Sequence, residues 1–536
     1  MGTIEKNQGI VPAVTPSWPE FTSSAANGTY MLTLNYAVSG TLSMNANVII
    51  IFSGGRFTGT GTISGNNTTF VMPPTQCFDA TINFSGTWKM EKVYAENFGD
   101  TNGTNAAPAI NSALKFSNIS GCIVQLLGKI YSITDTIVIR GNNKLQGTIH
   151  GPFQAGDSVV SKEGTVIFVP SGYNINAILV QTTGNSSTSD IDCYRFAIKD
   201  LTIRHSGSST TATLGNSIYI EATNVLTPRN GLISNILIQH TTSNGYGIRV
   251  SGGSYIEFHN IGIGGGKGVI VTGEKLQEFL WFNKIIFNSV SLTSFEITHG
   301  NNIYLTEVDT NDSDVGLMIN NSTGGTFNVF VNRYNSARCA YGIILRIYNQ
   351  YLTRIKVSEA TIHQAYGQAK TPVAAIYIDK GAHNSLTADN CIFENINVDS
   401  VSLFGTAYRA INDNNNGNAA TNITNSRFIN IKTIDKINLN TGSVWPNNQL
   451  SILSMIQGGI LRPGVSSSSY THTFYASPNS PLPGKPIVVV STNTTIPFSV
   501  TSSNVQGGAC TFTVTFSSLP PSSVEIYFQC TGYFST

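Results

Sequence analysis

Asn302-Ile-Tyr-Leu305, Asn328-Val-Phe-Val331 and Arg354-Ile-Lys-Val357 are three copies of one short motif, a polar residue followed by two apolar residues that bracket a variable one. Further copies begin at Asp200, Asn235, Asn260, Asn283, Asn390 and Asn425. The steps between successive first residues are 35, 25, 23, 19, 26, 26, 36 and 35 residues. A repeat of this length indicates one supersecondary unit per copy, stacked on its neighbours.

A second series of short apolar stretches alternates with the first. Its members begin at Ser217, Gly247, Gly268, Phe295, Gly316, Gly342 and Ala375. No helical apolar period of useful length lies between the two series. Two alternating strand families are typical of an all-β solenoid, the parallel β-helix, in which each strand pairs with the same strand of the next coil.

A β-sandwich or a β-propeller of similar short strands is the alternative fold. Steps that vary from 19 to 36 residues argue against propeller blades, whereas a solenoid absorbs insertions in its loops. Asparagine at one repeated turn position is expected to form a ladder, with each side-chain amide bonding to the next coil. These features favour the β-helix.

Three parts are expected along the chain. Residues 1–90 form an N-terminal β-rich segment, and residues 91–462 form the β-helix. A helix at 106–117, with Pro108 near its first turn, is expected to cap the stack. A serine run at 466–469 marks a linker, and residues 463–536 are predicted to form a C-terminal β-sandwich for trimerisation or carbohydrate binding.

Composition disfavours several functions. Charged residues make up 11% of the 536 residues, and 30 basic against 29 acidic residues give a net charge of +1. Without a long basic run, no nucleic-acid partner is expected. The longest aliphatic runs have strand length, so no membrane insertion is expected, and the N-terminus lacks an apolar signal-peptide core. We therefore expect a protein made in the cytoplasm that leaves by another route.

The opening of the β-helix resembles a known family. The residues that carry the resemblance are Tyr94-Ala-Glu-Asn-Phe-Gly-Asp-Thr-Asn-Gly-Thr104, the helix at 106–117, and the stretch from Gly121 to Ile139. They look like the start of the pectate-lyase-like superfamily, a right-handed parallel β-helix. The similarity covers about residues 47–435. Where the family usually has an acidic pair after the Gly-Asp turn, this chain has Asn102-Gly-Thr-Asn105.

Within that superfamily, the extra N-terminal segment and the C-terminal β-sandwich resemble a bacteriophage tailspike. The resemblance implies a homotrimer in the virion, made in the host cytoplasm and attached to the phage tail or baseplate through its N-terminus. It implies an endo-acting glycoside hydrolase that binds and depolymerises bacterial surface polysaccharide, either capsule or O-antigen. Two alternatives stay open, a secreted polysaccharide lyase that eliminates at a uronate and a receptor-binding fibre without catalysis. The fold alone does not choose among them.

Stacking the coils on the repeated polar residue predicts which carboxylates meet. Five residues after it come Glu307, Arg333 and Glu359 on three consecutive coils, and seven residues after it comes Asp309. The position between is mostly apolar, so both columns are expected to point outward. With roughly 3.3 Å per strand residue and about 4.8 Å per coil, the carboxylate pairs fall near the roughly 6.5–9.5 Å that inverting glycosidases need. Glu307, Asp309 and Glu359 are the candidate catalytic residues.

The same alignment places Asn288, Gly265 and His240 in the five-residue column of the preceding coils.

The charged residues of this column also have an alternative interpretation, in which they stabilise the stack and do not act on a substrate. An alternating Glu-Arg-Glu ladder avoids like charges on neighbouring strands, and carboxylates on an outer column are commonly just solvated.

Arg333, Tyr334 and His363 are candidate substrate contacts. In a lyase, Arg333 would neutralise the uronate carboxyl while His363 or Tyr334 supplies the base. Glu257 and His259, two apart on one strand face, are further candidates for substrate binding or acid/base work.

No cofactor is expected. The loop Asp309-Thr-Asn-Asp-Ser-Asp314 is acidic enough to be tested for calcium, although it lacks the glycine and the closing glutamate of an EF-hand loop. An acidic surface loop is the alternative. No Cys/His spacing suggests zinc.

Overall fold

The computed structural model describes residues 4–6, 11–12, 28–148, 164–182, 193–207, 214–222, 227–241, 244–273, 277–348, 351–363, 370–380, 388–399, 409–414, 423–432, 437–438, 449–451, 457–461, 467–475, 487–502, 509–521 and 523–531. The chain divides into two compact units. The first contains residues 1–269 and 279–281, and the second contains residues 270–278 and 282–536.

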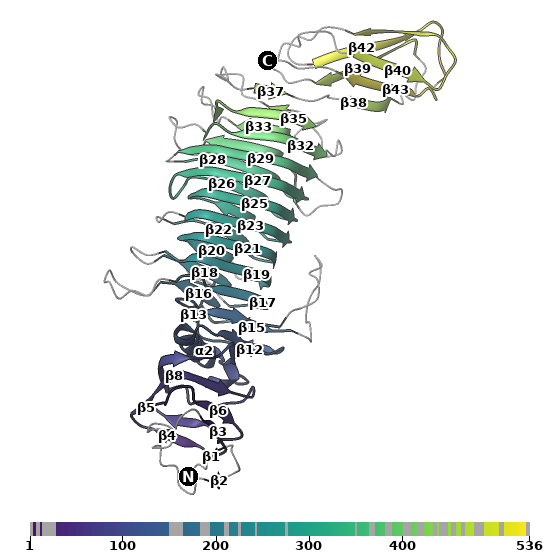
Figure 1. Ribbon diagram of the computed structural model, residues 1–536. Coiled ribbons are helices and arrows are strands. Elements are labelled where there is room, and N and C mark those ends of the chain that lie inside the picture. The colour runs from purple at the N-terminus through teal and green to yellow at the C-terminus, as the bar shows by residue number, and fades with distance from the viewer. Residues whose placement is uncertain are drawn as a thin grey trace. The chain divides into compact units, whose positions relative to one another are not determined.

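The N-terminal segment of the first unit is itself a stack of parallel coils (Figure 1). β3 (Thr29–Leu32), β6 (Ile49–Phe52) and β8 (Thr62–Val71) pair in parallel, with Thr29, Ile49 and Thr69 at steps of 20 residues. The sequence predicts a β-rich segment here. The structure shows in addition that these strands form regular coils of 20 residues. The other strands are β1 (Ile4–Lys6), β2 (Val11–Pro12), β4 (Tyr36–Val38), β5 (Thr41–Ser43), β7 (Phe57–Gly59) and β9 (Asn83–Trp88).

Helix α2 (Ala107–Ser120) forms where the sequence predicts it and ends at Gly121, whose φ of 74° suits a glycine C-cap. Its Phe116 packs on Phe84 of β9, with ring centroids 4.7 Å apart. On another side, its Asn111 Oδ1 accepts a hydrogen bond from the backbone N–H of Val138 in β13. The helix therefore covers the start of the main coils, as predicted for a capping helix, and its other side packs on the N-terminal coils.

Each main coil has three faces, and the strand pairing in the first unit shows them: two faces lie in one long sheet and the third lies in a separate sheet. β17 (Ala197–His205) pairs along its first half with β14 (Lys144–Gln146) and along its second half with β15 (Val166–Val169). A separate parallel sheet contains β13 (Ile137–Ile139), β16 (Ile178–Gln181), β18 (Ile218–Glu221), β20 (Tyr246–Ser251) and β22 (Lys267–Val271). The predicted parallel β-helix is confirmed.

The remaining main-coil elements of the first unit are η1 (Ala95–Phe98), β10 (Lys92–Tyr94), β11 (Ile123–Gln125), β12 (Ile130–Ser132), β19 (Arg229–His240) and β21 (Gly253–Gly264). Two strands are divided between the units: β22 belongs to the first unit up to Val269, and β23 (Gln277–Asn288) belongs to it only through residues 279–281.

In the second unit, long and short strands alternate in the same way, and successive long strands lie side by side in Figure 1. The long-strand sheet contains β25 (Gly300–Asn311), β27 (Thr326–Ala337), β29 (Leu352–His363), β31 (Ala388–Asp389), β32 (Ile392–Asp399), β34 (Ile423–Thr424), β35 (Arg427–Lys432) and β37 (Gln449–Ser451). The second sheet contains β24 (Thr293–Ile297), β26 (Val315–Asn320), β28 (Tyr341–Ile347), β30 (Ala374–Lys380), β33 (Arg409–Asn414) and β36 (Ile437–Asn438).

Sharp corners divide the long strands into faces. The corner residues have positive φ and lie five apart, as Asn302 (55°), Glu307 (56°) and Asp312 (56°) do on β25. We call the first two positions corner A and corner B. The left-handed region tolerates Asn and Asp best, and other side chains there cost on the order of 1 kcal/mol each.

The register of the second unit corrects one predicted equivalence. The N–H of Ser289 donates to the carbonyl of Asn311 (3.1 Å), which places Ser289 opposite Asp312 and therefore Lys284 opposite Glu307. The prediction that Asn288 stands beside Glu307 is wrong by four residues. Counted from Lys284 to Glu307, the coil step is 23 residues rather than 19. The slip arises because corners recur every five residues and carry similar polar side chains.

From β25 onward the predicted columns are confirmed. Thr306, Asn332 and Ser358 are paired across three coils, and Asp309, Asn335 and Thr361 are paired likewise. Between these columns, Val308, Tyr334 and Ala360 are each 1% exposed. Further buried columns, such as Ile303, Val329 and Ile355, fill the core with aliphatic side chains.

The predicted asparagine ladder is also present. The Asn235 amide donates to Asp200 Oδ1 (2.8 Å), and the Asn260 amide donates to Asn235 Oδ1 (2.9 Å). In the second unit the Asn430 amide donates to Asn395 Oδ1 (2.8 Å).

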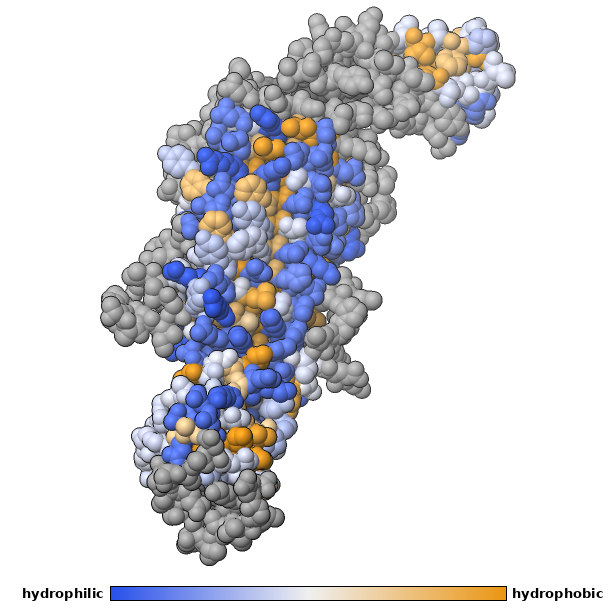
Figure 2. Space-filling view, in the orientation of Figure 1, coloured by the Kyte–Doolittle hydropathy of each residue, from blue (hydrophilic) through white to orange (hydrophobic). Residues whose placement is uncertain are grey.

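The C-terminal part consists of two three-stranded antiparallel sheets over a shared apolar core, as predicted for a β-sandwich. One sheet contains β38 (Gln457–Leu461), β40 (Ile487–Thr492) and β43 (Ile526–Thr531), and the other contains β39 (Ser469–Tyr475), β41 (Phe498–Ser502) and β42 (Ala509–Phe516). The predicted boundary at residue 463 is wrong, because residues 457–461 already pair with β43 in this part. Among the described residues, no helix is both long and apolar enough to cross a membrane. Figure 2 shows mostly hydrophilic surface on the visible side, interrupted by smaller apolar patches.

Candidate functional site

The outer surface of β25, β27 and β29 carries all three predicted catalytic residues, together with Arg333. Glu307, Arg333 and Glu359 occupy corner B on three consecutive coils. Asp309 follows on the second face of β25, two residues after the corner. All four side chains reach the surface, because the buried column of Val308 and its equivalents separates corner B from the Asp309 column.

Glu307 and Arg333 form an ion pair across adjacent coils, with Nη1 and Oε1 2.5 Å apart. The two side chains are 42% and 54% exposed, so water screens the pair and its contribution to stability is at most about 1 kcal/mol. Glu359, on the next coil, is exposed, and among the described residues it has no ion-pair partner. Glu359 therefore presents a carboxylate that no cation of the described chain neutralises.

Asp309 lies in a different environment from its neighbours at the corner. Its Oδ1 accepts hydrogen bonds from the side-chain amides of Asn335 (2.9 Å) and Asn311 (3.3 Å), whereas within the described residues Oδ2 has none. Desolvation raises the pKa of the Asp309 carboxyl, and the two amides and the charge of His363 offset part of that increase. A carboxyl of this kind is held at one oxygen and free to carry a proton on the other.

His363, at the end of β29, is half-buried and close enough for its charge to act on Asp309. Its main chain is held by a hydrogen bond from the Arg338 N–H to its carbonyl (3.1 Å). The structure thus brings His363 to the same face as Asp309.

Tyr334 is not available to a ligand. Its ring lies in the buried column, 1% exposed, and its hydroxyl donates to the carbonyl of Gly342 (2.8 Å) while contacting Thr310 Oγ1 (3.1 Å). Tyr334 was predicted as a substrate contact or base, and this is wrong, because the side chain at the sixth position after corner A points into the core.

Aromatic residues on the first face of the same coils are absent from the sequence predictions. Tyr304 and Phe330 are paired in register, and their rings stack with centroids 5.2 Å apart and an interplanar angle of 13°. Phe330 is 36% exposed, and the next coil continues the column with Lys356, which pairs with Glu394 (2.7 Å). The sequence does contain a signal for these rings. They occupy the variable position of the repeated motif, two residues after corner A, and strand alternation turns the side chain at that position outward.

Glu257 and His259 lie on β21 in the first unit, both exposed and on the same face. They do not belong to the group around Asp309. Beside them stand the partly exposed rings of Tyr255, Phe279 and Trp281.

The acidic loop considered for calcium is largely neutralised by cations of the same chain. Asp312 pairs with Arg338 (2.5 Å), and Asp314 pairs with Lys370. Within the part of the chain that the structure describes, no group of three or more His, Cys, Asp or Glu side chains is arranged to hold a metal ion.

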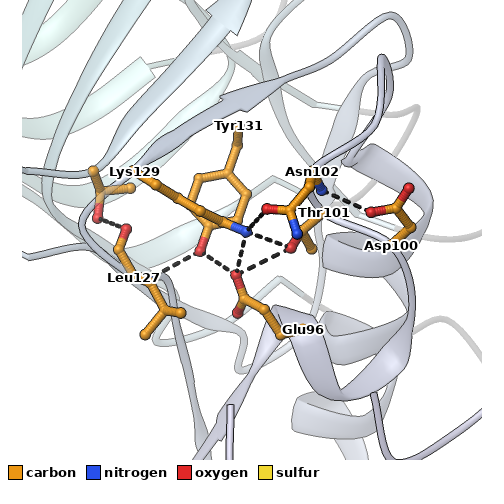
Figure 3. Close-up of polar contacts among 8 residues, drawn as sticks. Glu96, Asp100, Thr101, Asn102, Leu127, Lys129 and Tyr131 are labelled. Carbon is orange, nitrogen blue, oxygen red and sulfur yellow. Dashed lines mark hydrogen bonds and ion pairs between the residues drawn. The ribbon is translucent and has the colours of Figure 1, made fainter. Parts of the chain in front are cut away.

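A second polar cluster, at the start of the main coils, is structural (Figure 3). Glu96 Oε1 accepts hydrogen bonds from Tyr131 (2.7 Å) and Thr101 (3.1 Å) and pairs with Lys129 (3.0 Å). Lys129 also donates to Asn102 Oδ1 (2.7 Å), in the segment where the chain departs from the family pattern. Because the Glu96 side chain is only 9% exposed, this cluster ties the turn to β12 rather than meeting a ligand.

No family model matches the sequence. No curated protein matches it either. Among solved structures, an exopolygalacturonase from Thermotoga maritima is 13% identical with a TM-score of 0.40, covering 68% of this chain and 91% of its own. A tailspike of an Acinetobacter phage is 11% identical with a TM-score of 0.33, covering 83% and 81%.

The A-module of a mannuronan C-5 epimerase from Azotobacter vinelandii is 12% identical with a TM-score of 0.35, covering 64% of this chain and 95% of its own. At these identities and TM-scores, the matches say nothing about the activity of this chain. The assignment to a parallel β-helix rests on its own strand pairing.

Proposed function

We propose that this protein is an endo-acting depolymerase that binds and hydrolyses bacterial surface polysaccharide, with Asp309 as proton donor and Glu359 as base. The observation that carries the proposal is the environment of Asp309. An outward-facing carboxyl with a pKa raised by desolvation is what a glycosidase uses as its general acid. The amides of Asn335 and Asn311 orient it through Oδ1.

In the proposed reaction, the proton on Asp309 Oδ2 moves to the glycosidic oxygen as the bond to the anomeric carbon breaks. A water molecule attacks that carbon from the opposite side and gives its proton to the second carboxylate. Glu359 suits this second role because it is exposed and no described cation pairs with it. Glu307 is the alternative base, but Arg333 already pairs with its carboxylate. The products are a new reducing end and a new hydroxyl end.

The surface around the carboxylates also suits a sugar chain. The stacked rings of Tyr304 and Phe330 form a partly exposed apolar surface on one side of corner B, and the amides of Asn335 and Asn311 lie on the other. Rings meet the C–H faces of a pyranose, whereas amides and carboxylates bond to its hydroxyls. Arg333 and His363 are proposed as further contacts to this substrate.

The proposed setting is a homotrimeric tailspike in a phage virion, attached to the tail or baseplate through the N-terminal segment. It is supported by the resemblance of residues 94–139 to the pectate-lyase-like opening and by the C-terminal β-sandwich. Light scattering on the purified chain tests the trimer, with three times 57.4 kDa as the expected mass.

The test of catalysis compares three isosteric variants. Asp309→Asn and Glu359→Gln are each expected to lower kcat by about 10²–10⁴-fold, the usual contribution of a general acid or base. Glu307→Gln is expected to change it less than tenfold. The assay spots the protein on lawns of diverse capsulated bacteria, then measures reducing ends and ultraviolet absorbance on polysaccharide from strains that show a halo.

Different results would redirect the assignment. An unsaturated, ultraviolet-absorbing product would replace hydrolysis with a lyase reaction at a uronate. If Asp309→Asn kept full activity, the assignment of Asp309 as proton donor would be wrong. Binding to cells without any cleavage of the glycan would identify a receptor-binding fibre.

A further inference from the structure

The first unit carries a cluster of rings on its surface that the proposed catalytic site does not use. Tyr255 and Phe279 stack with ring centroids 4.8 Å apart and an interplanar angle of 9°. Trp281 lies beside both, with centroids 6.2 Å away and its plane tilted by 39° and 30°. We call these three residues the aromatic shelf. Tyr255 is 47% exposed, and the other two are partly exposed.

Two of these rings belong to residues with a strained backbone conformation. Tyr255 (φ 56°) and Phe279 (φ 53°) both occupy corner A, in the left-handed region. Most other coils have asparagine at this corner, the residue that tolerates such φ values best: Asn230, Asn302, Asn328, Asn390 and Asn425. A bulky ring there is strained by on the order of 1 kcal/mol, a cost that an asparagine at the same corner would largely avoid.

The polar surroundings of the shelf suit a hydroxyl-rich ligand. Glu257 and His259, both exposed, lie on the same strand and continue its outer face. An acceptor carboxylate and an imidazole beside flat rings match the hydroxyl edges and C–H faces of a sugar. A nucleic acid would instead require several cations for its phosphates, whereas the strands that carry the rings place one exposed lysine, Lys284, near them together with the exposed Glu257.

The size of the shelf argues against a second copy of the chain as its occupant. Rings of this kind cover about 150–250 Å² each, so three partly exposed ones present on the order of 300 Å² at most. A stable protein–protein interface needs roughly 800 Å² from each partner. The shelf is therefore of the size of one or two sugar residues rather than of a subunit.

We propose that the aromatic shelf is a second, non-catalytic saccharide-binding site, at which Tyr255, Phe279 and Trp281 stack on sugar rings while Glu257 and His259 bond to their hydroxyls. This inference rests on the proposed function, because the ligand is a segment of the same polysaccharide that the Asp309 site cleaves. Its role is to hold a long chain on the protein while the catalytic site acts.

The decisive variants are Tyr255→Asn and Phe279→Asn, separately and together. Asparagine restores the residue that corner A prefers, so the melting temperature is expected to stay the same or rise. The binding probe is polysaccharide purified from a strain on which the wild-type protein makes a halo, titrated against full-length protein made inactive by Asp309→Asn. The double variant is expected to bind at least tenfold more weakly, while its kcat on short oligosaccharides, measured with Asp309 intact, is unchanged.

Two further measurements complete the test. Tyr351→Ala removes a ring that is 64% exposed elsewhere in the chain and is expected to leave binding unchanged. Trp281 fluorescence is expected to change on titration with the polysaccharide, and a Trp281→Phe variant is expected to lose that change while keeping most of the affinity.

The outcomes separate this inference from the proposed function. If the protein cleaves polysaccharide but the double asparagine variant binds as tightly as its parent, the shelf is not a binding site and the function stands. If the double variant instead changes the molar mass in light scattering, the shelf is an interface between subunits. If no polysaccharide of a broad panel is bound or cleaved, both proposals are wrong.

Discussion

At the scale of the residue, two carboxylates two positions apart on β25 have different chemistry. Glu307 stands on the exposed corner and is paired with Arg333. Asp309 is half-buried on the next face, where desolvation raises its pKa and amides hold one oxygen. Burial, not residue type, therefore separates the candidate proton donor from its neighbour.

The pH dependence of catalysis follows from Asp309. A general acid must be protonated, so the rate is expected to fall as pH rises through its raised pKa. The Asn335 amide stabilises the ionised form, so Asn335→Ala is expected to raise that pKa further and move the alkaline limb of the kcat/KM profile to higher pH. A limb that does not move in Asn335→Ala would mean that another group donates the proton.

Tyr334 gives a second prediction at this scale. Tyr334→Phe leaves the buried carbonyl of Gly342 without its donor, so we expect a loss of about 1–2 kcal/mol in the free energy of unfolding. KM for polysaccharide is expected to be unchanged, because the ring is enclosed. Denaturation curves and steady-state kinetics on the same preparation check both statements. A raised KM at unchanged stability would contradict the structural role.

At the scale of the element, the corners decide which side chains can meet. A left-handed residue every five positions turns a strand of twelve residues into two faces, so residues on either side of corner B look in different directions. The sequence marks these corners by polar residues, but several corners look alike. This is why the motif count found the coils but put those before β25 out of register with Glu307, by four residues at Asn288 and by a whole corner at Gly265.

The corner and its ladder can be tested at Asn260. Asn260→Gly keeps a residue that tolerates φ of 54° and loses only the bond to Asn235, whereas Asn260→Ala also places a Cβ in the left-handed region. We expect Asn260→Ala to be the less stable of the two by about 1 kcal/mol. Urea denaturation measures the difference. Equal stabilities would show that the corner conformation is not maintained in solution.

At the scale of the whole molecule, stacking of coils buries polar groups that no local pattern reveals. His205 and His240 face each other in register on β17 and β19, with ring centroids 5.4 Å apart and no exposed surface. His240 was expected on the outer column, and this is wrong. Burial, with the charges of His205 and Lys267, lowers the pKa of His240 to about 3, and burial also lowers that of His205.

Acid should therefore destabilise the coils. Because the folded pKa lies below the ordinary value of 6.5, the unfolded chain binds protons that the folded chain does not, and stability is lost as pH falls below 6.5. His240 alone is expected to account for about 2 kcal/mol between pH 7 and pH 5. Melting temperatures across this range measure the loss, and His240→Gln is expected to flatten it. A melting temperature that does not depend on pH would contradict the burial of both rings.

The sequence by itself determined the solenoid, its alternating strand families, the helix at the start of the main coils and the C-terminal β-sandwich. These are local properties, because an apolar pair around a variable residue buries the same side of every coil whatever lies above or below it. The columns across β25, β27 and β29 were also predicted correctly, because these three coils have equal steps of 26 residues and the same residue positions therefore stack.

Only the tertiary structure decided the rest. The positions of the corners determine the register between coils. As a result, the side chains of Tyr334 and His240 lie in the core, whereas those of Tyr304 and Phe330 lie on the outer surface. The coils of residues 28–88 pack on one side of α2. The amphipathic pattern of the helix shows that it has a buried side but not which part of the chain covers it. Burial and the approach of Asn335 and His363 from other coils set the chemistry of Asp309, because electrostatic environment is a property of neighbours in space rather than in sequence.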